Sequence, residues 1–221
     1  RARSPLTLHP ASRRVTTPAP SPKDLLARAL VELRTLRQRL AEAQRARHEP
    51  IAVVGVGCRL PGDCDTPDAL WRLLCAGGDA TGEPPPGRWS EASDAALAGM
   101  YTRRGAYLRD VAGFDARFFG VSERELQSLD PQHRLVLEVC WEALEHAAIA
   151  PDRLRRGRTG VFCGISHSDY AHLLAERVPP DEADGFFGTG TALSFAPGRV
   201  AYFLGLHGPA LAVDTACSSS L

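Results

Sequence analysis

The sequence predicts an α/β domain that follows an α-helical coiled coil. Three short apolar runs have the length of buried strands, and segments with helical periodicity separate them. The runs are residues 51–57, 159–166 and 211–213, and the main helical segments are residues 68–76, 130–148 and 194–204. Ahead of them, the segment from Lys23 to Arg47 lacks Gly and Pro and carries leucines at heptad spacing. Strands that alternate with helices are typical of α/β proteins, which gather reactive groups at the carboxyl ends of strands.

Composition argues against several classes of function. The 221 residues contain 26 Lys and Arg against 26 Asp and Glu, and 44% of the residues are apolar. This balance favours neither nucleic acid nor a membrane surface as a partner, and no apolar run approaches the roughly 20 residues of a membrane span. The first residues, Arg1–Pro5, lack an initiator methionine and the apolar core of a signal peptide. We therefore expect a cut amino end and a cytoplasmic protein.

The first 48 residues predict a linker and then a coiled coil. Residues 1–22 carry five prolines without periodicity, which predicts a disordered linker. Residues 23–48 predict a coiled-coil docking helix of about three heptads. Its a positions are Leu26, Leu33 and Leu40, and its d positions are Ala29, Leu36 and Ala43. Glu32 at g and Arg37 at the following e would face each other in a parallel homodimer.

A single amphipathic helix packed on its own domain is the alternative for residues 23–48. Leu25, Leu30 and Val31 widen the apolar stripe beyond a two-residue seam, as core-facing helices do. We favour the dimer. Three heptads with two alanines at d are marginal alone, so the helix would add to a dimer already held by the domain that follows.

The domain begins at residue 49, where Pro50 closes the preceding helix. Residues 51–57 form a continuous apolar run, which predicts a strand buried on both faces. Gly55 and Gly57 resemble the start of a dinucleotide site, but the third glycine of that motif would fall at position 60, where Leu60 precedes Pro61. The helix that would hold the phosphates cannot begin there, so we set that site aside.

Capping residues place the helices that follow. Thr66 and Pro67 predict a helix start, and Gly77 predicts its end. Asp130 caps a helix that runs to about Ala148 with apolar residues on most faces, which predicts burial between layers.

Three further segments carry weaker signals. Residues 81–99 contain three consecutive prolines and predict a surface excursion. Residues 114–120 hold three phenylalanines, which are more often core than ligand site. Residues 185–190 are rich in Gly and Phe and predict a mobile or closely packed loop.

Cysteine and histidine spacing argues against a metal site. No C-x-x-C pair occurs among Cys58, Cys64, Cys75, Cys140, Cys163 and Cys217. We expect reduced thiols, neither a disulfide framework nor a zinc site, and no directly bound cofactor. His167 and His172 are five residues apart and do not share a helix face. For His133, near a helix start, we expect a structural or surface role rather than a catalytic one.

Cys217 is the candidate catalytic residue. It follows the apolar run at residues 211–213, and Ser218–Ser220 predict the start of a helix. At a strand-to-helix corner, free backbone N–H groups and the helix dipole stabilise a thiolate, the nucleophilic form of cysteine. A buried, inert thiol is the alternative that spacing alone leaves open.

Several blocks of the chain resemble one enzyme family. Residues 214–221, Asp-Thr-Ala-Cys-Ser-Ser-Ser-Leu, resemble the active-site signature of the β-ketoacyl synthase (ketosynthase) domains of modular type I polyketide synthases. Residues 198–209 resemble the segment before that signature, and residues 49–62 resemble the start of the domain. Residues 130–134 resemble an Asp-Pro-Gln-Gln-Arg block, with His133 in place of the second glutamine.

The resemblance implies the first half of a thiolase-like fold, with α/β/α/β/α layers, and a reaction. Cys217 would take an acyl chain from the phosphopantetheine of an acyl carrier protein, and a malonyl-type extender would then condense with it after losing carbon dioxide. Residues 23–48 resemble the helix that docks such a chain to the carrier at the end of the previous polypeptide. The family's two histidines and lysine lie after the cysteine, and none of this chain's histidines matches them. A glutamine-type loading synthase is disfavoured because position 217 is cysteine.

Two other functions compete with this one. A non-decarboxylating thiolase-like acyltransferase would use the same corner but lacks the blocks near residues 130 and 198. A coiled-coil docking or scaffold segment without catalysis is the second alternative. We expect the chain alone to be inactive and prone to aggregation, because the apolar residues 51–56 and 161–165 would lack cover.

Overall fold

The computed structural model describes residues 21–47, 49–86, 88, 98–179 and 181–219. The chain divides into two compact units, Arg1–Ala52 and Val53–Leu221. All but the last two residues of the predicted linker, 1–22, lie outside the described residues, as does most of the predicted surface excursion at residues 81–99. None of the described helices is long and apolar enough to cross a membrane.

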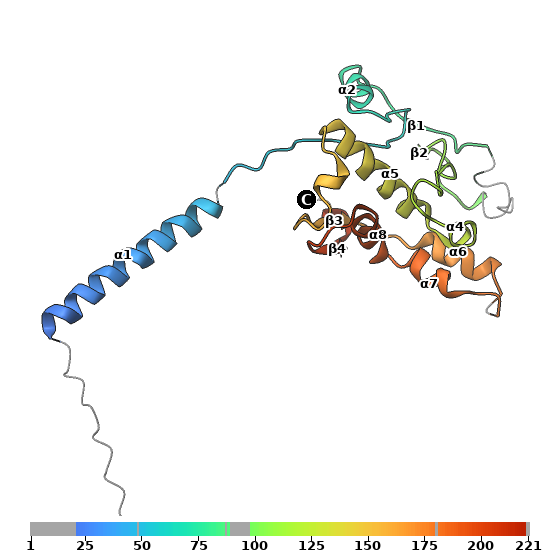
Figure 1. The fold of residues 1–221 in the computed structure, drawn as a ribbon. Coiled ribbons are helices and arrows are strands. Elements are labelled where there is room, and N and C mark those ends of the chain that lie inside the picture. Colours follow the sequence, from blue (N-terminus) through green and yellow to red (C-terminus); the bar gives the residue numbers. More distant parts are fainter. Residues whose placement is uncertain (1–20, 48, 87, 89–97, 180, 220–221) are drawn as a thin grey trace, which may run out of the picture. The chain divides into compact units, whose positions relative to one another are not determined.

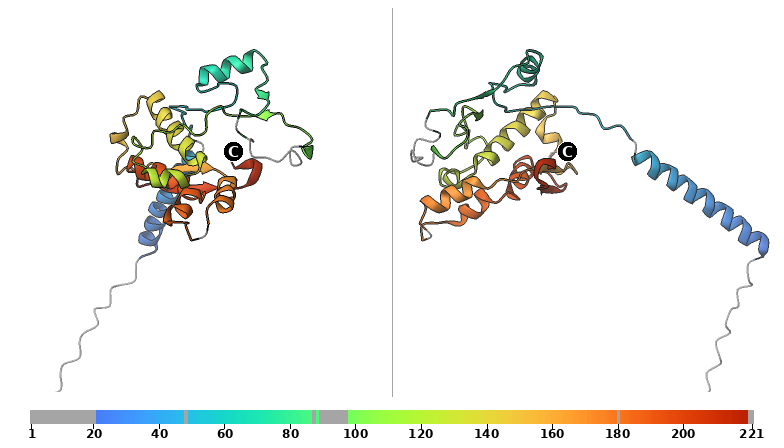
Figure 2. Two further views of the ribbon diagram at one scale, coloured as in Figure 1. Left: turned by 90° about the vertical axis from the view of Figure 1, so that its right-hand side faces the viewer. Right: turned by 180° about the vertical axis from the view of Figure 1, so that it is seen from behind.

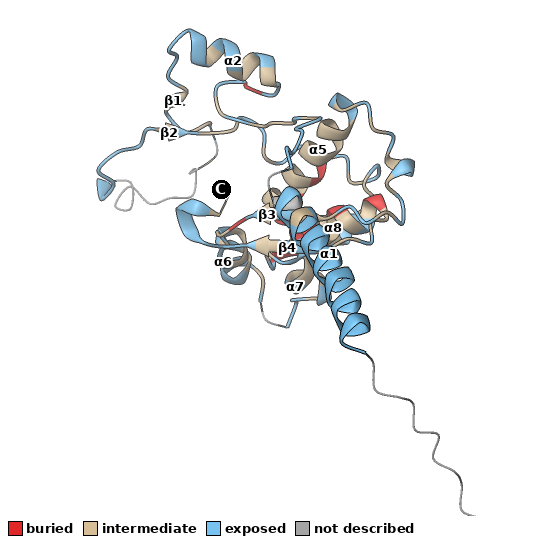
Figure 3. Ribbon diagram, turned by 90° about the vertical axis from the view of Figure 1, so that its left-hand side faces the viewer, coloured by how far each residue is buried: buried red, intermediate tan, exposed pale blue. Residues whose placement is uncertain are grey.

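The described part of the first unit contains one helix, α1 (Pro22–Arg47), which begins one residue before the predicted start. A capping box fixes its amino end, because Ser21 Oγ accepts from the Asp24 N–H at 3.2 Å and the Asp24 carboxylate accepts from the Ser21 N–H at 3.2 Å. Its leucines are between 49% and 63% exposed, and the helix is exposed along its length (Figure 3). No described residue of this unit covers the apolar stripe.

The second unit is a mixed α/β structure whose elements follow one another as shown in Figure 1. They are α2 (Pro67–Cys75), β1 (Thr81–Gly82), β2 (Gly105–Ala106), α4 (Glu123–Ser128), α5 (Pro131–His146), η1 (Pro151–Arg153), β3 (Val161–Gly164), α6 (Asp169–Arg177), α7 (Gly185–Thr191), α8 (Phe195–Leu204), β4 (Ala210–Val213) and η2 (Ala216–Ser218).

Two small sheets occur among the described residues. β1 and β2 are antiparallel, whereas β3 and β4 are parallel, with Val161 opposite Ala210 and Gly164 opposite Val213. The connection between β3 and β4 carries α6, α7 and α8. Because parallel strands end at the same edge, the chain leaves β3 and β4 on one side of this sheet.

The core lies between α5, α8 and β3. Leu137, Val200 and Leu204 are buried there, and Phe119 packs at a tilt against Phe203 with ring centroids 4.9 Å apart. The predicted core role of residues 114–120 is confirmed, although Phe118 remains 47% exposed at the edge of the cluster. Figures 1 and 2 show α2 on the opposite side of the unit from α7.

Local signals placed three helices correctly. Thr66 Oγ1 accepts from the Ala69 N–H at 3.1 Å, and Asp130 Oδ1 accepts from the Gln132 N–H at 2.8 Å, so both predicted N-caps are confirmed. The helix α8 ends at Gly205, whose φ of 65° is the left-handed conformation that glycine adopts without strain.

The prediction of a buried strand at residues 51–57 is wrong. This segment pairs with no strand among the described residues, and Ile51 and Val53 are 94% and 81% exposed. In the second unit, Gly55 and Gly57 lie so close to α5 that a Cβ on either would collide with its backbone. The glycines pack on α5, but a strand also needs hydrogen-bonding neighbours, which the described residues do not supply.

Two other expectations need correction. Residues 185–190 form the helix α7 rather than a loop, because Asp184 Oδ1 accepts from the Phe186 N–H at 2.8 Å and caps it. β3 and β4 are half-exposed rather than fully buried, with Phe162 66% and Leu211 50% exposed; among the described elements, α8 is the helix that packs most extensively on this small sheet.

Candidate functional site

Cys217 lies at a corner between β4 and a 3-10 turn, whereas the helix that the sequence predicts from Ser218 does not form within the described residues. β4 ends at Val213, and the 3-10 turn η2 (Ala216–Ser218) begins three residues later. The Ile165 N–H donates to the Val213 carbonyl at 3.1 Å, so the ends of β3 and β4 lie together. Cys217 therefore projects from the carboxyl edge of the parallel sheet, where α/β proteins place reactive groups. Ser220, which we expected to continue a helix, lies outside the described residues.

Short hydrogen bonds shape this corner. Asp214 Oδ1 accepts from the Ala216 N–H at 3.0 Å, and the Thr215 N–H donates to Ser219 Oγ at 2.9 Å. Ser218 Oγ donates to the Thr215 carbonyl at 2.9 Å, and Ser219 Oγ donates to the Ala216 carbonyl at 2.7 Å. Ser218 and Ser219 thus stabilise the turn through hydrogen bonds to nearby backbone groups. The sequence analysis did not predict this role, although serine is known to form such local backbone hydrogen bonds.

The corner directs the Cys217 backbone away from the strand. Ala216 has φ of 52°, a left-handed conformation that costs a non-glycine residue about 1–2 kcal/mol. The Cys217 side chain is exposed, and within the described residues its N–H has no hydrogen-bond acceptor. An accessible sulfur beside a free N–H is the arrangement that can attack a carbonyl and stabilise the resulting oxyanion.

The amino end of α5 lies against the segment that follows β3. Gln132 Nε2 donates to the His167 carbonyl at 2.8 Å and to Asp130 Oδ2 at 3.2 Å. The Asp130 N–H donates to the Gly190 carbonyl at 2.9 Å and so ties in the end of α7. Residues 130–134, the block that resembles the ketosynthase family, therefore hold the segment after β3 at the sheet edge on which Cys217 lies. No histidine among the described residues hydrogen-bonds to Cys217.

His133 is structural, not exposed. It is fully buried in α5, and neither ring nitrogen has a hydrogen-bond partner in the described structure. Burial, and then the nearby positive charge of Arg199, lower the pKa of His133 to about 4, so the ring is neutral near pH 7. Arg199 itself pairs with Glu125 and donates to the Thr189 carbonyl at 3.0 Å.

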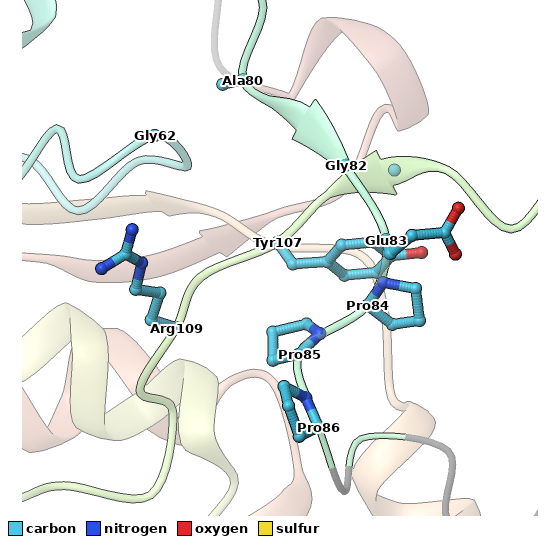
Figure 4. Close-up of a pocket in the computed structure, with 10 residues that line it drawn as sticks. Gly62, Ala80, Gly82, Glu83, Pro84, Pro85, Pro86, Tyr107 and Arg109 are labelled. Carbon is cyan, nitrogen blue, oxygen red and sulfur yellow. The ribbon is translucent and has the colours of Figure 1, made fainter.

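Other candidate sites do not involve Cys217. No group of three or more His, Cys, Asp or Glu side chains in the described part of the chain is arranged to hold a metal ion. A hollow of about 580 Å³ lies beside β1 and β2, and Figure 4 shows Tyr107, Arg109 and three prolines around it. None of its lining residues belongs to the corner at residues 214–219.

The comparisons with known proteins address the same residues. The family described as "Beta-ketoacyl synthase, N-terminal domain" matches residues 48–221. The chain belongs to the β-ketoacyl synthase family. This match includes the carboxyl edge, the helix α5 and Cys217, so the geometry described above is that of a β-ketoacyl synthase domain.

Curated relatives of this chain are polyketide synthases. The chain is 48% identical over 204 residues to "Polyketide synthase GfsB" of Streptomyces halstedii, and this match covers 90% of the chain and 4% of that protein. It is 49% identical over 197 residues to "Erythronolide synthase EryA3" of Saccharopolyspora erythraea, covering 89% of the chain and 6% of that protein. For a phenolphthiocerol/phthiocerol polyketide synthase of Mycobacterium tuberculosis, identity is 51% over 178 residues, covering 78% of the chain and 11% of that protein. The chain thus spans a small fraction of these relatives.

Solved ketosynthases share the fold. The ketosynthase from module 6 of the bacillaene synthase of Bacillus subtilis matches with a TM-score of 0.64 and 32% identity, covering 77% of this chain and 27% of that one. The oxazolomycin ketosynthase domain OzmH KS7 of Streptomyces albus matches with a TM-score of 0.63 and 34% identity, covering 76% and 30%. The predicted thiolase-like ketosynthase fold is confirmed.

Proposed function

We propose that Cys217 is the acyl-accepting nucleophile of a decarboxylating condensing enzyme, the β-ketoacyl-[acyl-carrier-protein] synthase of a polyketide synthase. The observation that carries the proposal is an exposed thiol at the carboxyl edge of β4, within a β-ketoacyl synthase domain, whose own N–H has no acceptor among the described residues. The enzyme class is acyltransferase.

The first step is a thioester exchange. The Cys217 sulfur attacks the carbonyl of an acyl chain held on the phosphopantetheine of an acyl carrier protein, and the carrier thiol leaves with the proton that the cysteine loses. Negative charge develops on the carbonyl oxygen during this attack. The Cys217 N–H, which has no other acceptor among the described residues, stabilises that charge by donating a hydrogen bond. One thioester replaces another, so the exchange is near balance and a nucleophilic thiol suffices.

The second step forms the carbon–carbon bond. A malonyl-type extender on a second carrier loses carbon dioxide, and its carbanion attacks the Cys217 thioester and releases the thiolate. The two histidines and the lysine implied by the resemblance have no match in this sequence, so we assign no residue here to decarboxylation. The carriers are therefore partners, and phosphopantetheine arrives with them rather than as a resident cofactor.

Mass spectrometry of the polypeptide that contains this chain tests the nucleophile. After incubation with a small acyl thioester, we expect the wild type to gain one acyl mass and Cys217→Ala to gain none. Cys75→Ala is the matched control, because Cys75 is also an exposed free thiol and has no place in the site. Equal labelling of the wild type and Cys217→Ala would contradict the proposal.

We also propose that α1 forms a parallel homodimer and docks the chain to an upstream polyketide synthase polypeptide. Leu26, Leu33 and Leu40 are exposed on one side of α1, and such a stripe is stable in water when a second helix covers it. The alternative function is that of a scaffold without catalysis, in which the chain acts through α1 alone. We propose a cytoplasmic location, because six free thiols suit a reducing compartment.

A further inference from the structure

A short basic surface lies on the segment between α5 and β3. Four arginines occur within six residues, and all four side chains are exposed. They are Arg153, Arg155, Arg156 and Arg158, which we name the arginine patch. The one acidic residue beside this stretch is Asp152. The concentration of charge is unusual, since the chain as a whole has equal numbers of acidic and basic residues.

The backbone beneath the arginine patch is fixed. η1 (Pro151–Arg153) begins the segment, and the Gly157 N–H donates to the Leu154 carbonyl at 2.8 Å. The Arg156 N–H donates to the Gly205 carbonyl at 2.7 Å, and the His207 N–H donates to the Gly157 carbonyl at 2.9 Å. These bonds join the segment to the end of α8. The arginines are therefore held in one region, where binding would order little backbone.

Intramolecular contacts explain only one of the four side chains. Arg155 packs its stem near Gly205 and lies 3.7 Å from Asp152. Arg153, Arg156 and Arg158 have no side-chain hydrogen bond or ion pair within the described residues. Like charges this close repel one another over a Debye length of about 8–10 Å, so the cluster does not stabilise the fold.

The arginine patch lies at the opposite edge of the sheet from Cys217. It precedes the amino end of β3, where the Val161 N–H donates to the Pro209 carbonyl at 2.8 Å, whereas Cys217 follows the carboxyl end of the parallel strand β4. A partner bound at the patch would thus contact a different edge from the one where the thiol reacts.

We propose that the arginine patch binds a carboxylate-rich surface of a partner protein and serves as an assembly contact, separate from the reaction at Cys217. Arginine pairs with carboxylates through two parallel hydrogen bonds, and three guanidinium groups of the patch are exposed and have no partner in the part of the chain that the structure describes. A nucleic acid fits less well, because a binder of that kind carries a basic excess over the whole domain, and this chain has a pI near 7.2.

Fluorescence anisotropy tests this assignment with defined probes. The probes are a labelled helical peptide of about 20 residues with glutamates along one face, the same peptide with glutamines, and a DNA duplex of about 20 base pairs. We expect the polypeptide that contains this chain to bind the glutamate peptide with an affinity that falls as salt rises, to bind the glutamine peptide at least about tenfold more weakly, and to prefer the glutamate peptide over DNA.

Matched triple variants locate the binding. Arg153→Gln, Arg156→Gln and Arg158→Gln together should weaken glutamate-peptide binding about tenfold or more, and the same three positions changed to Lys should retain most of it. The control changes three exposed arginines elsewhere in the second unit, Arg72→Gln, Arg103→Gln and Arg117→Gln, and should bind within about twofold of the wild type.

Several results would overturn the proposal: an equal loss in both glutamine triple variants, tighter binding of DNA, or no salt-sensitive binding of the glutamate peptide. Acyl loading of Cys217 should be unchanged in the patch variant, which also shows that this variant is folded. A loss of loading confined to the patch variant would place the patch in the reaction and contradict the proposal. Failure of every protein to load would contradict only the role of Cys217, and the peptide result would still decide the role of the patch.

Discussion

His133 shows how one buried ring links structure to pH. Its side chain on α5 is fully buried, and neither ring nitrogen has a hydrogen-bond partner in the described structure. The positive charge of Arg199 is near enough to disfavour the protonated ring. The folded protein therefore holds the imidazole neutral, with a pKa near 4, while the unfolded chain titrates near the ordinary value of 6.5.

Stability should fall as the pH drops from about 6.5 to 4. Within this window the unfolded state binds the proton and the folded state does not, so the contribution of His133 is complete above pH 6.5 and lost near pH 4. The full loss is roughly 3 kcal/mol. We expect His133→Gln, the residue of the resembling block, to reduce this acid sensitivity, as measured by urea unfolding of the polypeptide at pH 7 and pH 5.

His172→Gln is the control for that experiment, because His172 is exposed on α6. Its unfolding midpoint should change with pH as the wild type's does. If His133→Gln retained the full acid sensitivity, the buried neutral ring would not be its source.

At the scale of the element, α1 carries a surface that its own unit does not cover. The helix begins at a capping box, its leucines are exposed, and the a and d positions lie on one face. Propensity and capping determine that the helix forms, but three heptads need a partner to be stable.

We expect Leu33→Glu to weaken self-association by about tenfold or more, because it places a charge in the seam between two helices. Analytical ultracentrifugation of the polypeptide measures the dissociation constant. Thr35→Glu introduces the same side chain at an outward c position and should leave the constant nearly unchanged. Equal effects of the two changes would contradict the proposed seam.

At the scale of the whole molecule, the proposed activities belong to different parts of the chain. The exposed stripe is in the first unit, and Cys217 with its hydrogen-bonded corner is in the second. An enzyme and a docking scaffold therefore predict different results when the first part is removed.

Deletion of residues 1–48 from the polypeptide should abolish docking to the upstream partner and leave acyl loading of Cys217 intact. Co-purification measures the first and intact mass the second. A protein that loses acyl loading, although circular dichroism shows it folded, would contradict the assignment of separate roles.

Local signals in the sequence determined several features. Thr66 and Asp130 cap their helices, and the apolar run at residues 211–213 followed by small hydroxyl residues indicated a corner at Cys217. Each of these depends on neighbours within about four residues, so a reading of the sequence can identify it.

Only the tertiary structure decided the rest. Residues 51–57 have the composition of a buried strand, but pairing depends on a neighbour from elsewhere in the chain. The glycine-rich α7 is a helix because it is capped by Asp184 and because Gly190 allows close approach to the Ser128 carbonyl. The burial of His133 beside α8 likewise depends on long-range packing, which local propensity does not encode.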